Sequence, residues 1–206
     1  MKRTLAFAAS LLLLGACSSD GYTIRGKIAG LDNPYVYLLR YTGEVEVIDS
    51  AKVTKGDFVF KGKAEQPEVV YLSTDKQQPF VHFFLENGRI SVDGALSAPA
   101  DIAVLGTPSN DIQRAFDEKI AALEEEFAKA GNDVQRDSLR KEYSKLMSDA
   151  VEMNRDNIYG VTTFLNNAYA FLSPEEVMGQ IALFPAEWQQ RRELTELREA
   201  TERKLR

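Results

Sequence analysis

The spacing of hydrophobic residues changes near residues 106–109, and this change is what most constrains the fold. Before it, short runs rich in Val, Ile, Tyr and Phe alternate with turn residues at intervals of ~8–12 residues, as in antiparallel sandwiches and barrels. After it, apolar residues recur at steps of three and four, which is the spacing of one helix face. The sequence therefore predicts an α+β chain, with its strands before its helices.

Eight strands are predicted in the first half of the chain. They cover residues 22–29, 35–40, 45–53, 57–63, 69–73, 80–86, 89–93 and 102–105. Asn87-Gly88 predicts a tight hairpin turn between the sixth and seventh strands, because this dipeptide readily adopts positive φ angles. Lys55-Gly56 predicts a turn of the same kind between the third and fourth strands. We predict an antiparallel β-sandwich or open barrel over residues 22–108.

The second half, residues 109–206, is predicted to be a helical region. Its first helix presents Ile112, Phe116, Ile120, Leu123 and Phe127, and the next presents Leu139, Tyr143, Leu146 or Met147, and Ala150. Gly131-Asn132-Asp133 ends the first helix and caps the second, so the two form an antiparallel hairpin. Gly160 is predicted to interrupt the helical pattern. A capping box from Ser173 to Glu176 opens a short helix that ends near Ala182, and a last helix follows.

The N-terminal residues predict export and lipid anchoring. Lys2 and Arg3 precede an apolar run of ~10 residues, which suits a signal peptide and is shorter than the ~20 residues of a membrane-spanning helix. The run ends in Leu-Gly-Ala-Cys17, which resembles the bacterial lipobox. We predict a signal peptide at residues 1–16, a lipidated Cys17, and a short tether at residues 17–21. Ser18 favours the outer membrane, with the protein facing the periplasm.

Composition narrows the chemistry that the chain can perform. Cys17 is the only cysteine, and its lipidation would leave no thiol for a disulfide, a CxxC pair or a metal site. His82 is the only histidine, and its place inside a predicted aromatic strand favours packing over catalysis. The net charge of −6, without an evident cluster of basic residues, argues against nucleic acid and against charge-driven binding to anionic lipid. We predict no catalytic residue, metal or cofactor.

Four tyrosines are the best candidates for a binding site. Tyr35, Tyr37 and Tyr41 alternate along the second predicted strand and its end, and Tyr71 lies in the fifth. An exposed aromatic row on a sheet would bind a sugar or a peptide partner. The alternative is that these side chains build the sandwich core and its contact with the helices.

Four carboxylates leave a hydrolytic alternative open. Asp49, Asp57, Glu86 and Asp93 lie on or beside predicted strands, and glycoside hydrolysis needs only two such groups in one cleft. Each also stands at a strand end, where acidic side chains bind turn amides or face water. We favour the role in turns.

Several motifs resemble an N-terminal β domain of uncharacterised function that occurs in lipid-anchored envelope proteins. They include residues 22–31, 36–38, 49–53, 67 and 71–72, with GDFVFKG at 56–62, FLENG at 84–88 and GTPSN at 106–110. The resemblance implies a β domain placed ahead of a thioredoxin-like domain of a thiol-disulfide oxidoreductase. The motifs contain no catalytic residue.

These observations lead to three functional hypotheses. The first is a lipid-anchored, non-enzymatic envelope module that binds or positions a protein or peptide partner. The second is the N-terminal portion of a thioredoxin-like oxidoreductase whose CxxC lies outside these 206 residues. The third is a hydrolase that uses two carboxylates.

Overall fold

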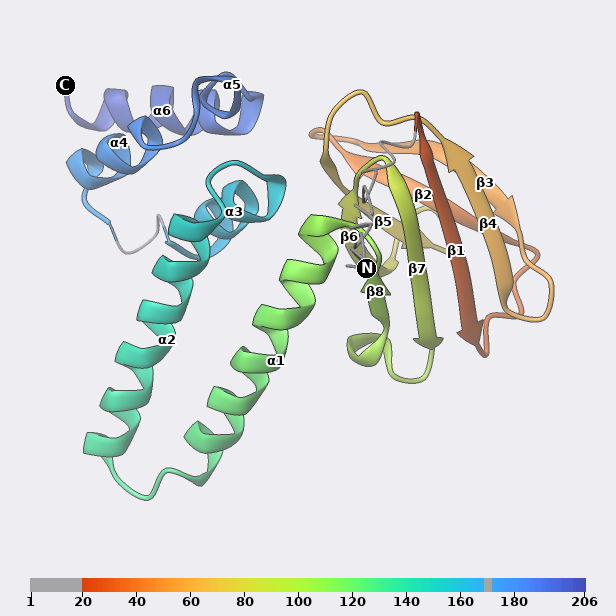
Figure 1. The fold of residues 1–206 in the computed structure, drawn as a ribbon, viewed down its shortest axis with the longest axis horizontal. Helices are drawn as coiled ribbons and strands as arrows, with labels where there is room; N and C mark the ends of the chain where they lie inside the picture. Colours follow the sequence, from red (N-terminus) through yellow and green to blue (C-terminus); the bar gives the residue numbers. More distant parts are fainter. Residues whose placement is uncertain (1–19, 169–171) are drawn as a thin grey trace, which may run out of the picture.

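The computed structural model describes residues 20–168 and 172–206, which form a β-sandwich followed by a helical region (Figure 1). The strands are β1 (Tyr22–Ala29), β2 (Tyr35–Tyr41), β3 (Val45–Lys52), β4 (Asp57–Gly62), β5 (Glu68–Ser73), β6 (Pro79–Leu85), β7 (Gly88–Ala95) and β8 (Ala103–Leu105). The predicted signal peptide and Cys17 lie outside the described residues. The α+β fold class is confirmed.

The strands form two four-stranded sheets that do not close into a barrel. One sheet has the order β4-β1-β7-β8 and the other β3-β2-β5-β6. The prediction of an entirely antiparallel sandwich is wrong at one pairing, because β1 and β7 run parallel. Parallel neighbours need a long connection, and here the whole second sheet lies between them in the sequence.

Two predicted turns connect the sheets instead of joining paired strands. The hairpin predicted at Asn87-Gly88 is wrong, because β6 pairs with β5 whereas β7 pairs with β1 and β8. The Asn87 side chain instead holds the main chain of Ala64 through two hydrogen bonds of 2.9 and 2.8 Å. The tight turn predicted at Lys55-Gly56 does form, because both residues adopt positive φ angles of 53° and 84° and two main-chain hydrogen bonds of 2.9 and 3.0 Å join Thr54 to Asp57. The strands on either side of it nevertheless enter different sheets.

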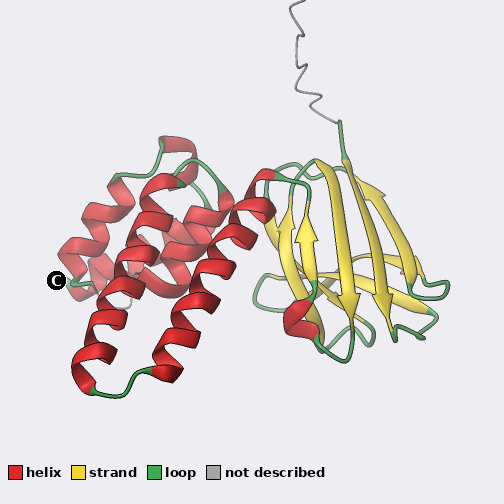
Figure 2. Cartoon of the chain, turned by 60° about the horizontal axis from the view of Figure 1, so that its bottom comes forward, coloured by secondary structure: helices red, strands yellow, loops and turns green. Residues whose placement is uncertain are grey.

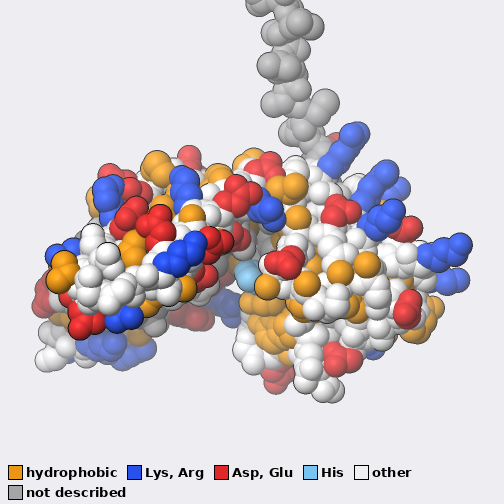
Figure 3. Space-filling model, turned by 90° about the horizontal axis from the view of Figure 1, so that it is seen from below, with side chains coloured by type: hydrophobic (Ala, Val, Ile, Leu, Met, Phe, Trp, Pro, Cys, Tyr) orange, Lys and Arg blue, Asp and Glu red, His pale blue; other side chains and the backbone are white. Residues whose placement is uncertain are grey.

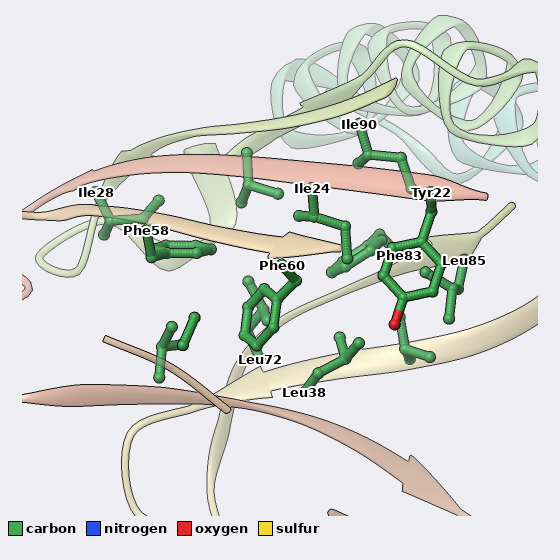
Figure 4. Packing of buried hydrophobic residues seen from close by; sticks show 14 of the residues in the cluster. Tyr22, Ile24, Ile28, Leu38, Phe58, Phe60, Leu72, Phe83, Leu85 and Ile90 are labelled. Carbon is green, nitrogen blue, oxygen red and sulfur yellow. The ribbon is translucent and has the colours of Figure 1, made fainter. Parts of the chain in front are cut away.

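The sandwich core lies between the inward faces of the two sheets (Figure 4). Phe58 and Phe60 point inward from β4, with their rings 5.8 Å apart in an edge-to-face arrangement. The other labelled members are Tyr22, Ile24, Ile28, Leu38, Leu72, Phe83, Leu85 and Ile90. Alternation along each strand places these residues on one face, as period-two patterning requires.

The helical region begins directly after β8. It consists of α1 (Pro108–Lys129), α2 (Asp133–Met153), α3 (Ile158–Thr163), a π-helical turn (Phe164–Ala168), α4 (Pro174–Ala182), α5 (Ala186–Gln189) and α6 (Arg192–Lys204). The hairpin of α1 and α2 is confirmed, and Asn132 caps α2 by accepting a hydrogen bond from the Gln135 amide. The Ser173–Glu176 capping box is confirmed. Among the described residues, no helix combines the length and hydrophobicity needed to cross a membrane.

A polar junction joins the sandwich to α1, where the two parts meet in Figure 2. The Asn110 side chain accepts a hydrogen bond from the Phe84 amide at 2.9 Å and donates one to the Phe84 carbonyl at 2.8 Å. Glu86 accepts hydrogen bonds from the Ser109 amide and hydroxyl at 3.1 and 2.7 Å. A carboxylate at this position suits the positive end of the helix dipole.

Phe84 adds an apolar contact to the same junction. It points away from the sandwich core and packs in the helical core, where its ring lies 6.1 Å from that of Tyr159. Tyr159 stacks in turn on Phe116 of α1 at 5.5 Å. The outer face of β6 is therefore covered by helices at this end.

Candidate functional site

The outer face of the β3-β2-β5-β6 sheet carries the predicted tyrosines. Tyr35 and Tyr41 are 47% and 40% exposed, and Tyr37 and Tyr71 are half-buried. None of the four belongs to either hydrophobic core of the described residues. The alternative that these side chains build the sandwich core and its contact with the helices is therefore wrong for the core, although Tyr41 and Tyr71 do face the helices across a groove.

The pairing of the strands brings the tyrosines together on one surface, which we call the aromatic face. Tyr71 is opposite Leu39 of β2 on one side and His82 of β6 on the other. The Tyr41 ring meets the Tyr71 ring edge-on at 4.7 Å, and the Tyr71 ring lies 6.1 Å from that of His82. The aromatic face comprises Tyr35, Tyr37, Leu39, Tyr41, Val45, Val47, Tyr71 and His82.

The edge strand β3 extends this face with aliphatic side chains. Val45 and Val47 are 45% and 43% exposed and lie opposite Tyr41 and Leu39. Leu39 is fully buried beneath its neighbours. Alternating Val residues in a predicted strand were visible in the sequence, but their position beside the tyrosines depends on which strands pair.

A groove of about 960 Å³ separates one end of the aromatic face from the helices. Tyr41, Tyr71 and His82 line its sheet side, and Ile158 and Leu165 line its helical side. Figure 3 shows the histidine in pale blue in the hollow between the two parts. Charged residues of both parts share this lining, among them Arg40, Glu68 and Arg191.

Charged groups border the groove. Arg40 forms a two-pronged ion pair with Glu68, with Nη2 donating to Oε1 at 2.6 Å, and also contacts Glu46 at 3.2 Å. The hydrogen bond to Glu68 holds the pKa of Arg40 above its usual value. Burial, and then the neighbouring Tyr41, raise the pKa of Tyr71. Tyr71 therefore keeps its hydroxyl proton at neutral pH and remains a hydrogen-bond donor.

Arg191 forms the helical rim of the groove. Its side chain is 8% exposed, and Nη1 donates to the Pro67 carbonyl of the sandwich at 2.8 Å. The guanidinium also lies 5.3 Å from the Trp188 ring centre. These contacts fix the C-terminal helices beside the start of β5.

The four candidate carboxylates do not meet in a cleft. Glu86 binds Ser109 in the α1 junction, and Asp49 accepts a hydrogen bond from the Ser50 amide at 2.7 Å. Asp57 and Asp93 are exposed on the outer face of the other sheet, both opposite Lys27. Residues 20–168 and 172–206 contain no cluster of three or more His, Cys, Asp or Glu that could hold a metal.

Asp117 of α1 faces His82 at the edge of the sheet, and we expect it to make folding stability depend slightly on pH. Burial raises its pKa, and Gln113, His82 and Arg114 lower it in part. The folded chain therefore holds this proton more tightly than the unfolded chain, so Asp117 lowers stability as pH rises through its folded pKa. We expect Asp117→Asn to stabilise the protein at pH 7 by less than about 1 kcal/mol, because the side chain still reaches solvent.

Thermal unfolding followed across acidic and neutral pH measures this effect. The stabilisation should disappear below about pH 4, where the unfolded aspartate is also protonated. Asp32→Asn, in an exposed turn, is the matched control and should show no such gain. A gain that is equal at all pH values would contradict the explanation by titration.

The fold and the aromatic face define an α+β protein whose sandwich leaves the outer face of the β3-β2-β5-β6 sheet partly uncovered. Residues 22–113 match the family described as Domain of unknown function (DUF4369). The match covers the whole sandwich and extends into the first residues of α1, so it includes the junction made by Glu86, Ser109 and Asn110. No curated protein matches the chain.

Proposed function

We propose that this chain is a lipid-anchored, non-enzymatic module of the cell envelope that binds a partner protein through the aromatic face. The observation that carries the proposal is the uncovered row from Tyr35 to Tyr71, continued by Val45 and Val47. Isolated exposed hydrophobic residues are ordinary, but a contiguous patch on a sheet marks an interaction surface.

The composition of the aromatic face favours a protein over a sugar. Interface centres are enriched in Tyr and Arg, and charged residues surround them. Here tyrosines and valines form the face and Lys76 lies over one of the tyrosines, whereas Arg40 and Glu46 alternate with them along β2 and β3 and point to the other side of the sheet. Lys76 places its ammonium 4.7 Å from the Tyr37 ring centre. The exposed valines would add little to sugar binding, which relies on aromatic stacking and polar contacts.

Site-specific photocrosslinking in intact cells tests the aromatic face. A photoreactive residue in place of Tyr35 should yield a discrete adduct with one envelope protein, and Tyr41→Ser in the same chain should reduce its yield several-fold. Val59 is the matched control site, because it is a 49% exposed hydrophobic residue on the opposite sheet. Equal adducts from both sites, or none from Tyr35, would refute the proposal. Binding of an oligosaccharide in place of a protein would refute the choice of partner.

Lipid anchoring at Cys17 is the second part of the proposal, and its support is the resemblance of residues 14–17 to a lipobox. Dual acylation gives stable anchoring, whereas a single chain binds only marginally. Metabolic labelling with a fatty acid should mark the wild-type protein and leave Cys17→Ala unlabelled. Label retained by Cys17→Ala would rule out this assignment.

A second candidate function follows from the motifs that resemble the N-terminal part of a thiol-disulfide oxidoreductase. In that case the sandwich and helices would position a thioredoxin-like domain, and the aromatic face would contact that domain or its substrate. An in-frame CxxC in the coding DNA beyond codon 206 would favour this function. A stop codon at that point would remove it.

A further inference from the structure

The outer face of the other sheet, β4-β1-β7-β8, carries four basic side chains. Outward-pointing residues alternate along its strands, and Thr23 of β1 lies between Lys61 of β4 and Arg89 of β7. Arg25 occupies the next outward position along β1, and Lys27 the one after it. We call Arg25, Lys27, Lys61 and Arg89 the basic face.

These charges are exposed, and no carboxylate lies directly opposite Arg25, Lys61 or Arg89 on a paired strand. None of the four forms an ion pair with another described residue, whereas Arg40, Arg114 and Arg136 elsewhere do. Asp57 and Asp93 lie beside Lys27, at the far end from Tyr22. The positive charge is therefore concentrated at the end where β1 begins.

The basic face was missed in the sequence because its members are distant from one another. Lys61 and Arg89 are separated by 27 intervening residues and meet on either side of β1 only through the parallel pairing of β1 with β7. The expectation that the chain has no cluster of basic residues is wrong for this surface. Figure 3 shows Lys and Arg side chains gathered on the sandwich beside the start of the described chain.

We propose that the basic face binds the anionic headgroups of phospholipids and lays the sandwich flat on the membrane. The proposal rests on the proposed lipid anchor at Cys17. Five residue steps separate Cys17 from Tyr22, and an extended chain spans at most about 3.6 Å per residue. An anchored chain therefore holds the start of β1 within about 18 Å of the lipid surface, next to Lys61 and Arg89.

Electrostatics supports this occupant over a neutral one. Each Lys or Arg brought near an anionic bilayer strengthens binding about fivefold, and the attraction decays within about 10 Å at ordinary salt concentrations. A lipid chain combined with a basic patch is a known way to secure a peripheral protein. With the basic face on the bilayer, the aromatic face on the opposite sheet points away from it and stays open to a partner.

The test uses an unlipidated chain that starts at Ser18, so that only the folded surface contributes. This chain should co-sediment with phosphatidylcholine vesicles that contain phosphatidylglycerol, and not with vesicles of phosphatidylcholine alone. High salt should abolish the binding. Lys61→Glu combined with Arg89→Glu should weaken it at least about tenfold.

The matched control is Lys141→Glu combined with Lys204→Glu. It changes the net charge by the same amount at two exposed helical positions, and it should leave vesicle binding within about twofold of the wild type. Equal losses in both variants would overturn the proposal, because net charge would then explain the effect. Binding to a short DNA duplex as tight as to anionic vesicles would also overturn it, because the surface would then bind any polyanion.

Orientation gives an independent readout. The chain from Ser18 contains no cysteine, so single cysteines can be placed at will. An environment-sensitive dye on Thr23→Cys should respond to anionic vesicles, and the same dye on Ser50→Cys of the opposite sheet should not. A response at Ser50 alone would reverse the orientation and refute the proposal. Failure of vesicle binding with normal fatty-acid labelling of Cys17 would reject the basic face and leave the anchor intact.

Discussion

Asn110→Ala is expected to lower the free energy of unfolding by about 3 kcal/mol. Asn110 is 2% exposed, and its amide binds both the N–H and the C=O of Phe84 and donates to the Thr107 hydroxyl at 2.7 Å. Phe84 lies on the edge strand β6, so this side chain takes the place of a neighbouring strand's peptide group. Alanine would leave buried main-chain groups without partners, at a cost of about 1–3 kcal/mol for each.

Urea unfolding followed by two probes measures the loss and locates it. Trp188 is the only tryptophan and is packed in the helical core, so its fluorescence reports the helical region. Far-UV circular dichroism reports both halves. In the wild type the two transitions should coincide, whereas in Asn110→Ala they should separate because α1 is no longer fastened to the sandwich.

Asn33→Ala is the control for this substitution, because Asn33 lies exposed in the turn after β1. It should change stability by less than about 0.5 kcal/mol. Asn110→Asp offers a stricter comparison, since it keeps the size and the acceptor but loses the donors to Phe84 and Thr107. If Asn110→Asp were as stable as the wild type, the explanation by hydrogen bonding would fail.

Local signals in the sequence predicted most of the individual elements. The capping box at Ser173 and the cap at Asn132 depend on residues three positions apart, so their geometry is encoded within a single turn. Strand positions followed from alternation, as at Phe58 and Phe60. These features need no knowledge of distant partners.

Local patterns in the sequence could not predict which strands pair with one another. Asn87-Gly88 has the composition of a hairpin turn, yet β6 and β7 do not pair with each other. Each strand is buried in a different sheet and pairs with the strands of that sheet. The sequence alone does not explain why the GTPSN and FLENG motifs contain these particular residues. The structure supplies that reason, because Asn110 and Ser109 bind Phe84 and Glu86 across the junction.

Some members of the candidate site could likewise be predicted from local patterns, whereas others depend on which strands pair. Parity along β2 grouped Tyr35, Tyr37 and Tyr41, but parity alone could not decide between the inner and outer faces. The addition of His82 required the pairing of β5 with β6. The basic face required three strands from distant parts of the chain, so no local pattern indicated it.

Gly160 is a glycine that close packing requires, although the sequence suggested that it breaks a helix. The sequence suggested an interruption of the helical pattern, but Gly160 lies inside α3. The break between α2 and α3 falls earlier, where the Asn157 side chain caps α3 by accepting a hydrogen bond from the Gly160 amide at 3.1 Å. Glycine is needed at 160 because a Cβ there would lie 1.9 Å from the Asn154 carbonyl oxygen.

Gly160→Ala is therefore expected to destabilise the protein by about 3 kcal/mol or more. The obstructing atom belongs to the backbone of a buried residue, Asn154, whose side chain also donates to the Ala150 carbonyl at 2.7 Å. Neither the turn nor α3 can move without disturbing the helical core, and overpacking of this kind typically costs 1–3 kcal/mol or more. Urea unfolding monitored by Trp188 fluorescence measures the change.

Gly179→Ala provides a control in which the same chemical change should have the opposite sign. Gly179 is an exposed residue of α4, and a Cβ there would meet no atom within 4 Å. Alanine in an open helix position stabilises by about 0.5–1 kcal/mol relative to glycine, because it restricts the unfolded chain. Stabilisation by both substitutions would show that Gly160 is not in steric contact with Asn154. Destabilisation by Gly160→Ala alone would show that close packing at the turn between α2 and α3 requires glycine.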